Sequence, residues 1–206
     1  MQGYDQKLPA AFCWTRFGTE AGESIGAILE RKEQERRAND GTFFWGIGNS
    51  VAPGLAALLE RYESPEVLFS PIKGRPRPVD SAPATVISWR AGQTLDGKDF
   101  DIPATVQVTS GGSRRRLGLG HYALVCSSSR PLAMADLGHL DFLALRNFVS
   151  GNPLGASQVT AVVKREKGRP ASDMQYAVAF RAALVWPYFV RLTQADPVED
   201  LLTLAS

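Results

Sequence analysis

Three tryptophans of this chain, Trp14, Trp45 and Trp89, lie next to polar or basic side chains rather than inside purely apolar runs. An indole ring can stack on the face of a planar heterocycle, while nearby amides and hydroxyls hydrogen-bond to its edge. A nucleic-acid base turned out of its duplex is recognised in this way. The alternative is that each tryptophan is an ordinary core residue, which is the more common role of any single tryptophan.

The stretch GTFFWGIGNS, residues 41–50, concentrates this chemistry. Strand alternation places Phe44 on the face opposite Trp45, so one face can join the core while the other lines a pocket. The glycines let the backbone approach a flat ligand, and Asn49 and Ser50 supply polar groups where the next helix begins. We therefore expect Trp45 to form a wall of an aromatic cage, with Asn49 as its hydrogen-bonding neighbour.

Basic residues gather in loops punctuated by glycine and proline, although the net charge of the whole chain is only +2. Basic loops on a nearly neutral body suit local contacts with phosphate groups, but they are also common as solubilising segments. These loops are residues 73–78, 113–118 and 164–170. The phosphate-binding candidates are Arg16, Arg114, Arg115, Arg116, Lys164, Arg165, Lys167 and Arg169.

Motifs of catalysis and metal binding are missing from the sequence, which has no GxSxG, Walker loop, HExxH or CxxC. We therefore predict no catalytic residues, no metal and no cofactor. Cys13 and Cys126 lie in apolar, strand-like stretches and are expected to be buried free thiols. An enzyme that acts on a nucleotide or small heterocycle in the same pocket is an alternative, and it would need an acid–base group there, such as Asp96, Asp99 or Glu20.

The bulk composition fits one globular domain with a core, because the 206 residues are 44% hydrophobic and 21% charged. No apolar run approaches the roughly 20 residues of a membrane helix. The first ten residues lack the basic-then-apolar layout of a signal peptide. We expect a cytoplasmic protein that does not contact a membrane.

Short alternating strands with a few helices between them favour the α+β class, as a small curved β-sheet or β-barrel flanked by helices. In the first helix, Glu33 and Arg37 are four apart in the order that favours an ion pair. The pattern predicts helices over 24–38, 51–62, 137–151 and from Asp196, and strands over 11–16, 66–70, 84–90, 104–109, 120–126, 157–166, 174–184 and 187–193.

The order of these features resembles the PUA-like superfamily, in particular its EVE and YTH branches. YTH domains show a Gly-x-Trp segment, an asparagine, a helix, a strand ending in Phe-Ser and a further strand, as in GTFFWGIGNS, EVLFS and ATVISW here. EVE domains carry Trp-x-Gly-x-x-Asn after an aromatic strand similar to FCWTRF, whereas this chain has Trp-Gly-x-Gly-Asn. HYALVCSSSRPL and NPLGASQV resemble later segments of the family.

The resemblance implies a small β-barrel over about residues 10–165 of a single domain, 1–206, with helices packed outside. It also implies binding of DNA or RNA through a flipped, modified base. Residues 175–206 exceed a minimal unit and are expected either to complete the barrel or to form a homodimer surface. Trp45, Asn49 and Ser70 are base-binding candidates by this resemblance, and Trp14, Trp89 and Ser50 are added from their positions in the sequence.

The leading hypothesis is thus a nucleic-acid-binding module that reads a methylated base. It predicts a pocket that is lined by Trp45 and at least one other tryptophan and rimmed by the basic loops. A non-catalytic interaction domain is a further alternative, and burial of Trp14, Trp45 and Trp89 without a cavity would support it.

Overall fold

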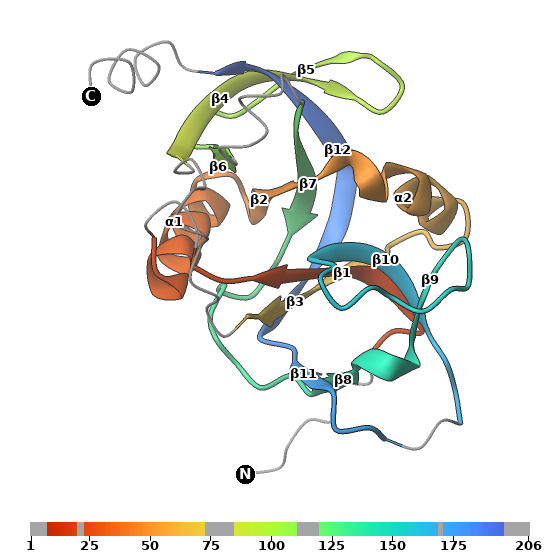
Figure 1. Cartoon of the computed structure of the whole chain (residues 1–206). Coiled ribbons are helices and arrows are strands. Elements are labelled where there is room, and N and C mark those ends of the chain that lie inside the picture. The colour runs from red at the N-terminus through yellow and green to blue at the C-terminus, as the bar shows by residue number, and fades with distance from the viewer. Residues whose placement is uncertain (1–7, 20–22, 73–84, 111–119, 169–170, 196–206) are drawn as a thin grey trace, which may run out of the picture.

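The computed structural model describes residues 8–19, 23–72, 85–110, 120–168 and 171–195. These residues form a large curved sheet and two helices, with the first helix at the left and the second at the right in Figure 1. In chain order the elements are β1 (Ala11–Phe17), α1 (Ile25–Ala38), β2 (Thr42–Ile47), the 3-10 turn η1 (Asn49–Val51), α2 (Ala52–Leu59), β3 (Glu66–Pro71), β4 (Thr85–Thr94), β5 (Asp99–Asp101), β6 (Gln107–Ser110), β7 (His121–Ser127), β8 (His139–Asp141), the 3-10 turn η2 (Phe142–Ala144), β9 (Leu145–Asn147), β10 (Thr160–Arg165), β11 (Gln175–Ala177) and β12 (Phe180–Ala195).

The central strand of the sheet is β12, which pairs antiparallel with β3, β7 and β4 along successive parts of its length. Its register shifts between Leu184 and Phe189 and again after Leu192, and such irregularities bend a strand. The order across the sheet is β2-β7-β12-β3-β1-β10-β9. Residues 180–195 of the segment expected to complete the barrel or to form a dimer surface therefore supply the middle of the sheet, and a core that ended at residue 165 would lack them.

The sheet curves but does not close into a barrel. Strands β2, β7, β12, β4 and β6 surround one apolar cluster, yet no ladder joins β2 to β6 among the described strands. The two strands meet through side chains, since a Cβ added to Gly46 would stand 2.5 Å from Cγ1 of Val108. The α+β class and the curved sheet are confirmed, and the closed barrel is wrong.

Buried apolar side chains form three clusters, each of which contains one tryptophan. The first cluster lies between the sheet and the two helices and includes Trp45. The second lies between β1 and the β8–β10 region and includes Trp14, and the third lies inside the curve of β4, β6, β7 and β12 and includes Trp89. The three indoles are therefore distributed over the fold rather than gathered at one place.

Most predicted elements are confirmed, whereas the helix predicted over 137–151 is wrong. This segment forms β8, η2 and β9, because β8 pairs with β11 and β9 pairs with β10. The second helix ends at Leu59 rather than at residue 62. The helix predicted from Asp196 lies outside the described residues. No helix in the described part of the chain is both long enough and apolar enough to cross a membrane.

Candidate functional site

Trp45 lies in a buried aromatic cluster at the end of β2, and only 7% of it is exposed. Its ring contacts Phe17 of β1, Phe69 of β3 and Phe180 of β12, with centroid distances of 5.6, 4.9 and 6.1 Å. A base could stack on this indole only after displacing one of these rings. In this conformation, the surroundings predicted for a cage are filled by the protein's own side chains.

Trp14 and Ser70 are both fully buried, and Trp14 Nε1 donates a hydrogen bond of 2.9 Å to Ser70 Oγ. Parallel pairing of β1 with β3 sets Arg16 opposite Ser70. The Arg16 guanidinium lies 4.6 Å from the ring centroid of Tyr176 and donates to two carbonyl oxygens of residues 156–158. This phosphate-binding candidate therefore anchors the loop that precedes β10.

Trp89 is 5% exposed and lies inside the curved sheet, with its ring 4.9 Å from that of His121. Its Nε1 is buried and has no hydrogen-bond partner among the described residues. The three candidate indoles, Trp14, Trp45 and Trp89, face different clusters and do not line a common pocket.

The described basic candidates lie at two ends of the β1–β10 ladder. Arg16 follows the residue paired with Thr160, whereas Lys164 pairs with Ala11 at the other end. Arg165 lies beside Lys164, and Lys167 follows β10; all three of these later cations are exposed. Arg114, Arg115, Arg116 and Arg169 lie outside the described residues.

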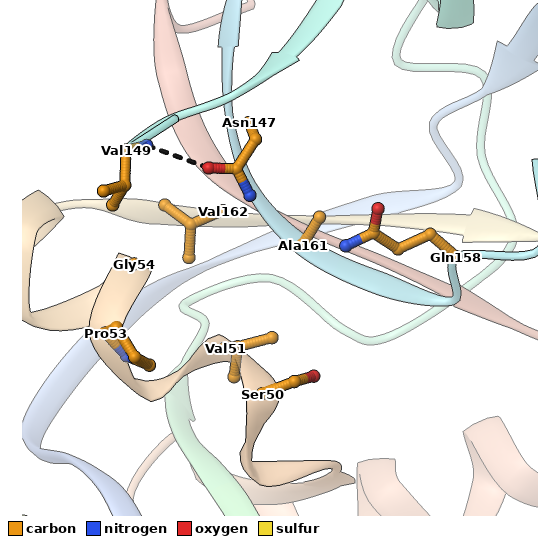
Figure 2. A pocket seen from close by; sticks show the side chains of 9 residues that line it. All are labelled: Ser50, Val51, Pro53, Gly54, Asn147, Val149, Gln158, Ala161 and Val162. Carbon is orange, nitrogen blue, oxygen red and sulfur yellow. Dashed lines mark hydrogen bonds between the residues drawn. The ribbon is translucent and has the colours of Figure 1, made fainter. Parts of the chain in front are cut away.

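A cavity of about 120 Å³ lies between the start of α2 and strands β9 and β10 (Figure 2). Its volume corresponds to about four waters at the density of the liquid. The wall is mainly aliphatic, it includes three polar side chains, and it contains neither an aromatic nor an ionisable residue. The lining residues are Ser50, Val51, Pro53, Gly54, Asn147, Val149, Gln158, Ala161 and Val162.

The first turn of α2 approaches β10 closely because position 54 carries no side chain. A Cβ at Gly54 would stand 2.9 Å from Cβ of Val162, which is closer than real Cβ contacts allow. Val51 and Val162 line the cavity and also belong to the core cluster that contains Trp45. Trp45 belongs to the same cluster as these two wall residues but is not part of the lining.

The polar groups of the cavity are held by local hydrogen bonds. Asn147 Oδ1 accepts from the backbone N–H groups of Val149 and Ser150, at 3.1 and 2.9 Å. Because two donors face that oxygen, the amide orientation is determined, and Nδ2 is directed into the cavity (Figure 2). Gln158 Nε2 donates at 3.4 Å to the Thr160 carbonyl oxygen, which leaves its Oε1 as an acceptor. The Ser50 hydroxyl can both donate and accept.

Ser50 is the base-binding candidate that the structure brings to this cavity. Asn49 is exposed at the start of η1 and is not among the lining residues. Sequence reasoning missed Asn147 because residues 137–151 read as a helix, and it missed Gln158 because that residue read as part of the strand predicted over 157–166. The sequence NFVSGN, which is rich in turn-forming residues, was the signal that could have placed Asn147 at a turn.

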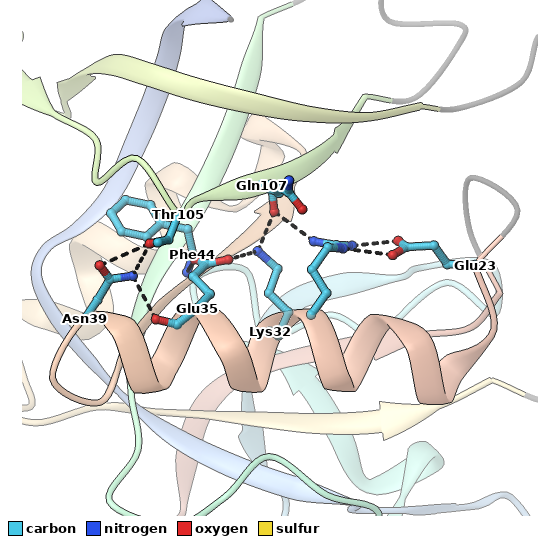
Figure 3. A network of polar contacts seen from close by, with 8 residues as sticks. Glu23, Lys32, Glu35, Asn39, Phe44, Thr105 and Gln107 are labelled. Atoms are coloured by element: carbon cyan, nitrogen blue, oxygen red, sulfur yellow. Dashed lines mark hydrogen bonds and ion pairs between the residues drawn. The ribbon is translucent and has the colours of Figure 1, made fainter. Parts of the chain in front are cut away.

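A buried ion pair forms a second polar cluster, at the gap between β2 and β6 (Figure 3). Lys32 Nζ donates to Glu35 Oε2 at 2.7 Å and to the Gln107 carbonyl oxygen at 2.6 Å, and Phe44 N–H donates to Glu35 Oε1 at 2.6 Å. Burial lowers the pKa of Lys32, while the Glu35 carboxylate opposes this shift. Because α1 supplies partners to both strand edges, we assign this pair a structural role.

Groups that catalysis would need lie elsewhere. Cys13 and Cys126 are buried free thiols, as predicted, and burial raises the pKa of Cys13 to about 12, which makes it a poor nucleophile. Asp96 and Asp99 lie on the β4–β5 hairpin rather than at the cavity, and Glu20 lies outside the described residues. The described chain contains no group of three or more His, Cys, Asp or Glu residues suited to a metal ion.

Searches of protein-family models, of curated proteins and of solved structures found no match to this chain. A functional proposal must therefore rest on the geometry of the site.

Proposed function

We propose that this chain is a nucleic-acid-binding module that takes up a base turned out of its strand, with the cavity beside α2 as the base site. The observation that carries the proposal is the neutral polar set on the cavity wall, which consists of Asn147, with Nδ2 directed into the cavity, Gln158 and Ser50. The Watson–Crick edge of a base presents donors and acceptors side by side, and flipped bases are read through that edge. The Asn147 amide donor and the Ser50 hydroxyl, which can accept, together match such an edge.

The rest of the wall also favours a neutral, flat ligand. Val51, Pro53 and Val162 offer apolar contacts to the faces of a ring. None of the lining residues is ionisable, so the wall offers no opposite charge to a charged group. The same composition supplies no general acid or base, which favours binding over catalysis at this site.

The proposed ligand is a methylated base, on the ground of the resemblance of residues 41–50 and 66–70 to EVE and YTH readers. In an aliphatic pocket, one additional buried methyl group contributes about 0.8 kcal/mol, or about fourfold in affinity. A modest preference for the methylated form is therefore expected from contact with Val51 or Val162 alone.

The test compares binding of short DNA and RNA oligonucleotides with and without N6-methyladenine or a methylated cytosine, for the wild type and for Asn147→Asp. Aspartate keeps an acceptor for Val149 N–H and Ser150 N–H but removes the donor directed into the cavity. We expect Asn147→Asp to weaken binding about tenfold or more, since a donor to the ligand is lost and a charge is added to the site.

The matched control is Asn152→Asp, which adds the same charge on the same turn at a residue that does not line the cavity. This variant should bind like the wild type. Equal binding of modified and unmodified oligonucleotides that is also unaffected by Asn147→Asp would overturn the proposal.

A non-catalytic interaction domain remains the second candidate, favoured by the burial of Trp14, Trp45 and Trp89 in separate clusters.

Trp186, in contrast, is 68% exposed, and its ring lies 5.7 Å from that of Phe100. A homodimer formed through this surface would dissociate in the Trp186→Ala variant, as sedimentation at several protein concentrations would reveal. Monomeric wild-type protein at all these concentrations would exclude the homodimer.

A further inference from the structure

Lys164 lies on the same face of β10 as the cavity-lining residue Val162, two residues further along the strand. Side chains alternate along a strand, and Val162 packs against Gly54 of α2, whereas Val163 belongs to the cluster on the opposite face. Two residues of strand span about 6–7 Å. Lys164 is therefore about one sugar length along the strand from the cavity wall.

The ammonium group of Lys164 is available for a ligand. No hydrogen bond or ion pair joins it to the described part of the chain, and the side chain is exposed. Its cross-strand neighbour Arg146 is neutralised by Glu166, with 2.5 Å between Nη2 and Oε2. Gly151 passes beside it without a side chain, since a Cβ there would stand 3.9 Å from Nζ.

Arg165 provides a contrast one residue further along the chain. Its side chain belongs to the opposite face of β10, where its guanidinium donates at 3.1 Å to the carbonyl oxygen of Leu8. Leu8 packs against the second core cluster. Of these two adjacent cations, Lys164 alone shares the face of Val162, the lining residue that packs against α2.

We propose that Lys164 binds the phosphate of the nucleotide whose base occupies the cavity beside α2. The ligand is then a nucleotide or a nucleic-acid strand, and not a free base or nucleoside. A lysine ammonium binds phosphate as a point charge, and the offset from Val162 matches a base and its phosphate separated by one sugar. This inference rests on the proposed function, because it requires the base to occupy the cavity.

The test measures binding of a fluorescently labelled single-stranded oligonucleotide, in DNA and RNA versions with the methylated bases above, to Lys164→Gln and to Arg165→Gln. Both variants remove one positive charge from the same strand. We expect Lys164→Gln to weaken binding about three- to tenfold and to reduce the slope of log affinity against log salt by about 1, with Arg165→Gln near the wild type. Equal affinity and slope for Lys164→Gln and the wild type would overturn the inference.

Competition with small ligands separates the sources of the phosphate. A nucleoside monophosphate should displace the oligonucleotide better than its nucleoside, and Lys164→Gln should abolish that advantage. If the nucleoside competes equally well, Lys164 does not bind the phosphate. If the monophosphate competes as strongly as the unlabelled strand, the ligand is a free nucleotide. If the monophosphate competes more weakly than the strand, the ligand is the phosphodiester of a nucleic acid. Failure of the wild type to bind any oligonucleotide would instead overturn the proposed function itself.

Discussion

At the scale of single residues, two side chains that were predicted to contact a ligand form hydrogen bonds with other groups of the protein instead. Ser70 follows a buried strand and was expected near the base pocket, yet its hydroxyl accepts from the indole of Trp14. Arg16 was expected to bind phosphate, yet it donates to the loop before β10. Sequence patterns identify which residues are polar and which strand holds them, whereas their partners come from strands far away in the chain.

Replacing Ser70 by alanine is expected to lower the free energy of unfolding by about 1–3 kcal/mol, because Trp14 Nε1 would remain buried without a partner. Urea denaturation followed by tryptophan fluorescence measures this change. Ser129→Ala, at an exposed position, is the control and should leave stability unchanged. If Ser70→Ala instead left stability intact and weakened oligonucleotide binding, Ser70 would belong to the ligand site.

Ionisation of Glu33 makes the free energy of unfolding depend on pH in the acid range. Hydrogen bonds from Arg36 lower its pKa to about 2, and the Leu132 N–H and Arg37 act in the same direction. The unfolded chain takes up the proton first, from its usual value of 4.5, so the contribution is present above that pH and is lost as the pH falls toward 2. The full contribution is about 3 kcal/mol.

We expect Glu33→Gln to remove this part of the pH dependence, because glutamine does not ionise. Unfolding by urea at successive pH values between neutral and strongly acid measures the difference from the wild type. Glu30→Gln, an exposed residue of the same helix, should follow the wild-type curve. Parallel curves for Glu33→Gln and the wild type would show that the ion pairs of Glu33 do not stabilise the fold.

The predicted pairing of Glu33 with Arg37 is confirmed, with 2.7 Å between Oε1 and Nε. The contacts of Glu33 with Arg36 and with the Leu132 N–H were not predicted from the sequence.

At the scale of elements, α1 seals the gap that the sheet leaves open. Its first half is amphipathic, but its buried face continues into Lys32, Glu33 and Glu35, which a sequence pattern assigns to solvent. The charges are buried because Phe44 N–H and the Gln107 carbonyl oxygen lack strand partners across the gap. The extent of α1 was predictable from its local periodicity and capping serine, whereas the burial of its charges was not, because it depends on two distant strands.

Replacing Glu35 by alanine is expected to cost about 3–5 kcal/mol of unfolding free energy, because Lys32 would be left as a buried unpaired charge. The double variant Lys32→Met with Glu35→Ala should cost less than the sum of the two single changes. Urea denaturation of the four proteins gives this coupling, and Gln34→Ala on the exposed face is the control. Additive single effects would mean that the pair does not act as a unit.

The segment 137–151 shows where element prediction fails. Its apolar residues Leu137, Leu140, Ala144 and Phe148 are spaced by three and four positions, which also fits one helical face. Pairing of β8 with β11 and of β9 with β10 decides between strand and helix, and both partner strands lie outside the segment. Because this segment was predicted as a helix, the role of Asn147 as a polar residue of the cavity wall was not predicted.

At the scale of the whole molecule, the sheet depends on β12, which contacts β3, β7 and β4. Alternation predicted strands in this part of the chain, but not that they form one bent strand at the centre. That position follows from tertiary pairing, which a local pattern does not contain.

Hydrogen exchange in the native state should show that the strands of the large sheet open at different free energies from the two-stranded sheet. We expect the paired amides of β12, β7 and β3 to exchange through global unfolding, because strands flank them on both sides. The two-stranded β8–β11 ladder should open at a lower free energy. Exchange measured by mass spectrometry at increasing urea would test this order, and equal protection of β11 and β12 would contradict it.

The place of β12 has a consequence for synthesis on the ribosome. Translation proceeds from the N-terminus, so β1, β2, β3, β4 and β7 all emerge before the strand that joins them. Until residues 180–195 leave the ribosome, β3 and β7 have no common neighbour, and their apolar faces remain open to other chains. Nascent chains interrupted before β12 should therefore be substrates for chaperones and proteases, and a late pause in translation would prolong that exposure.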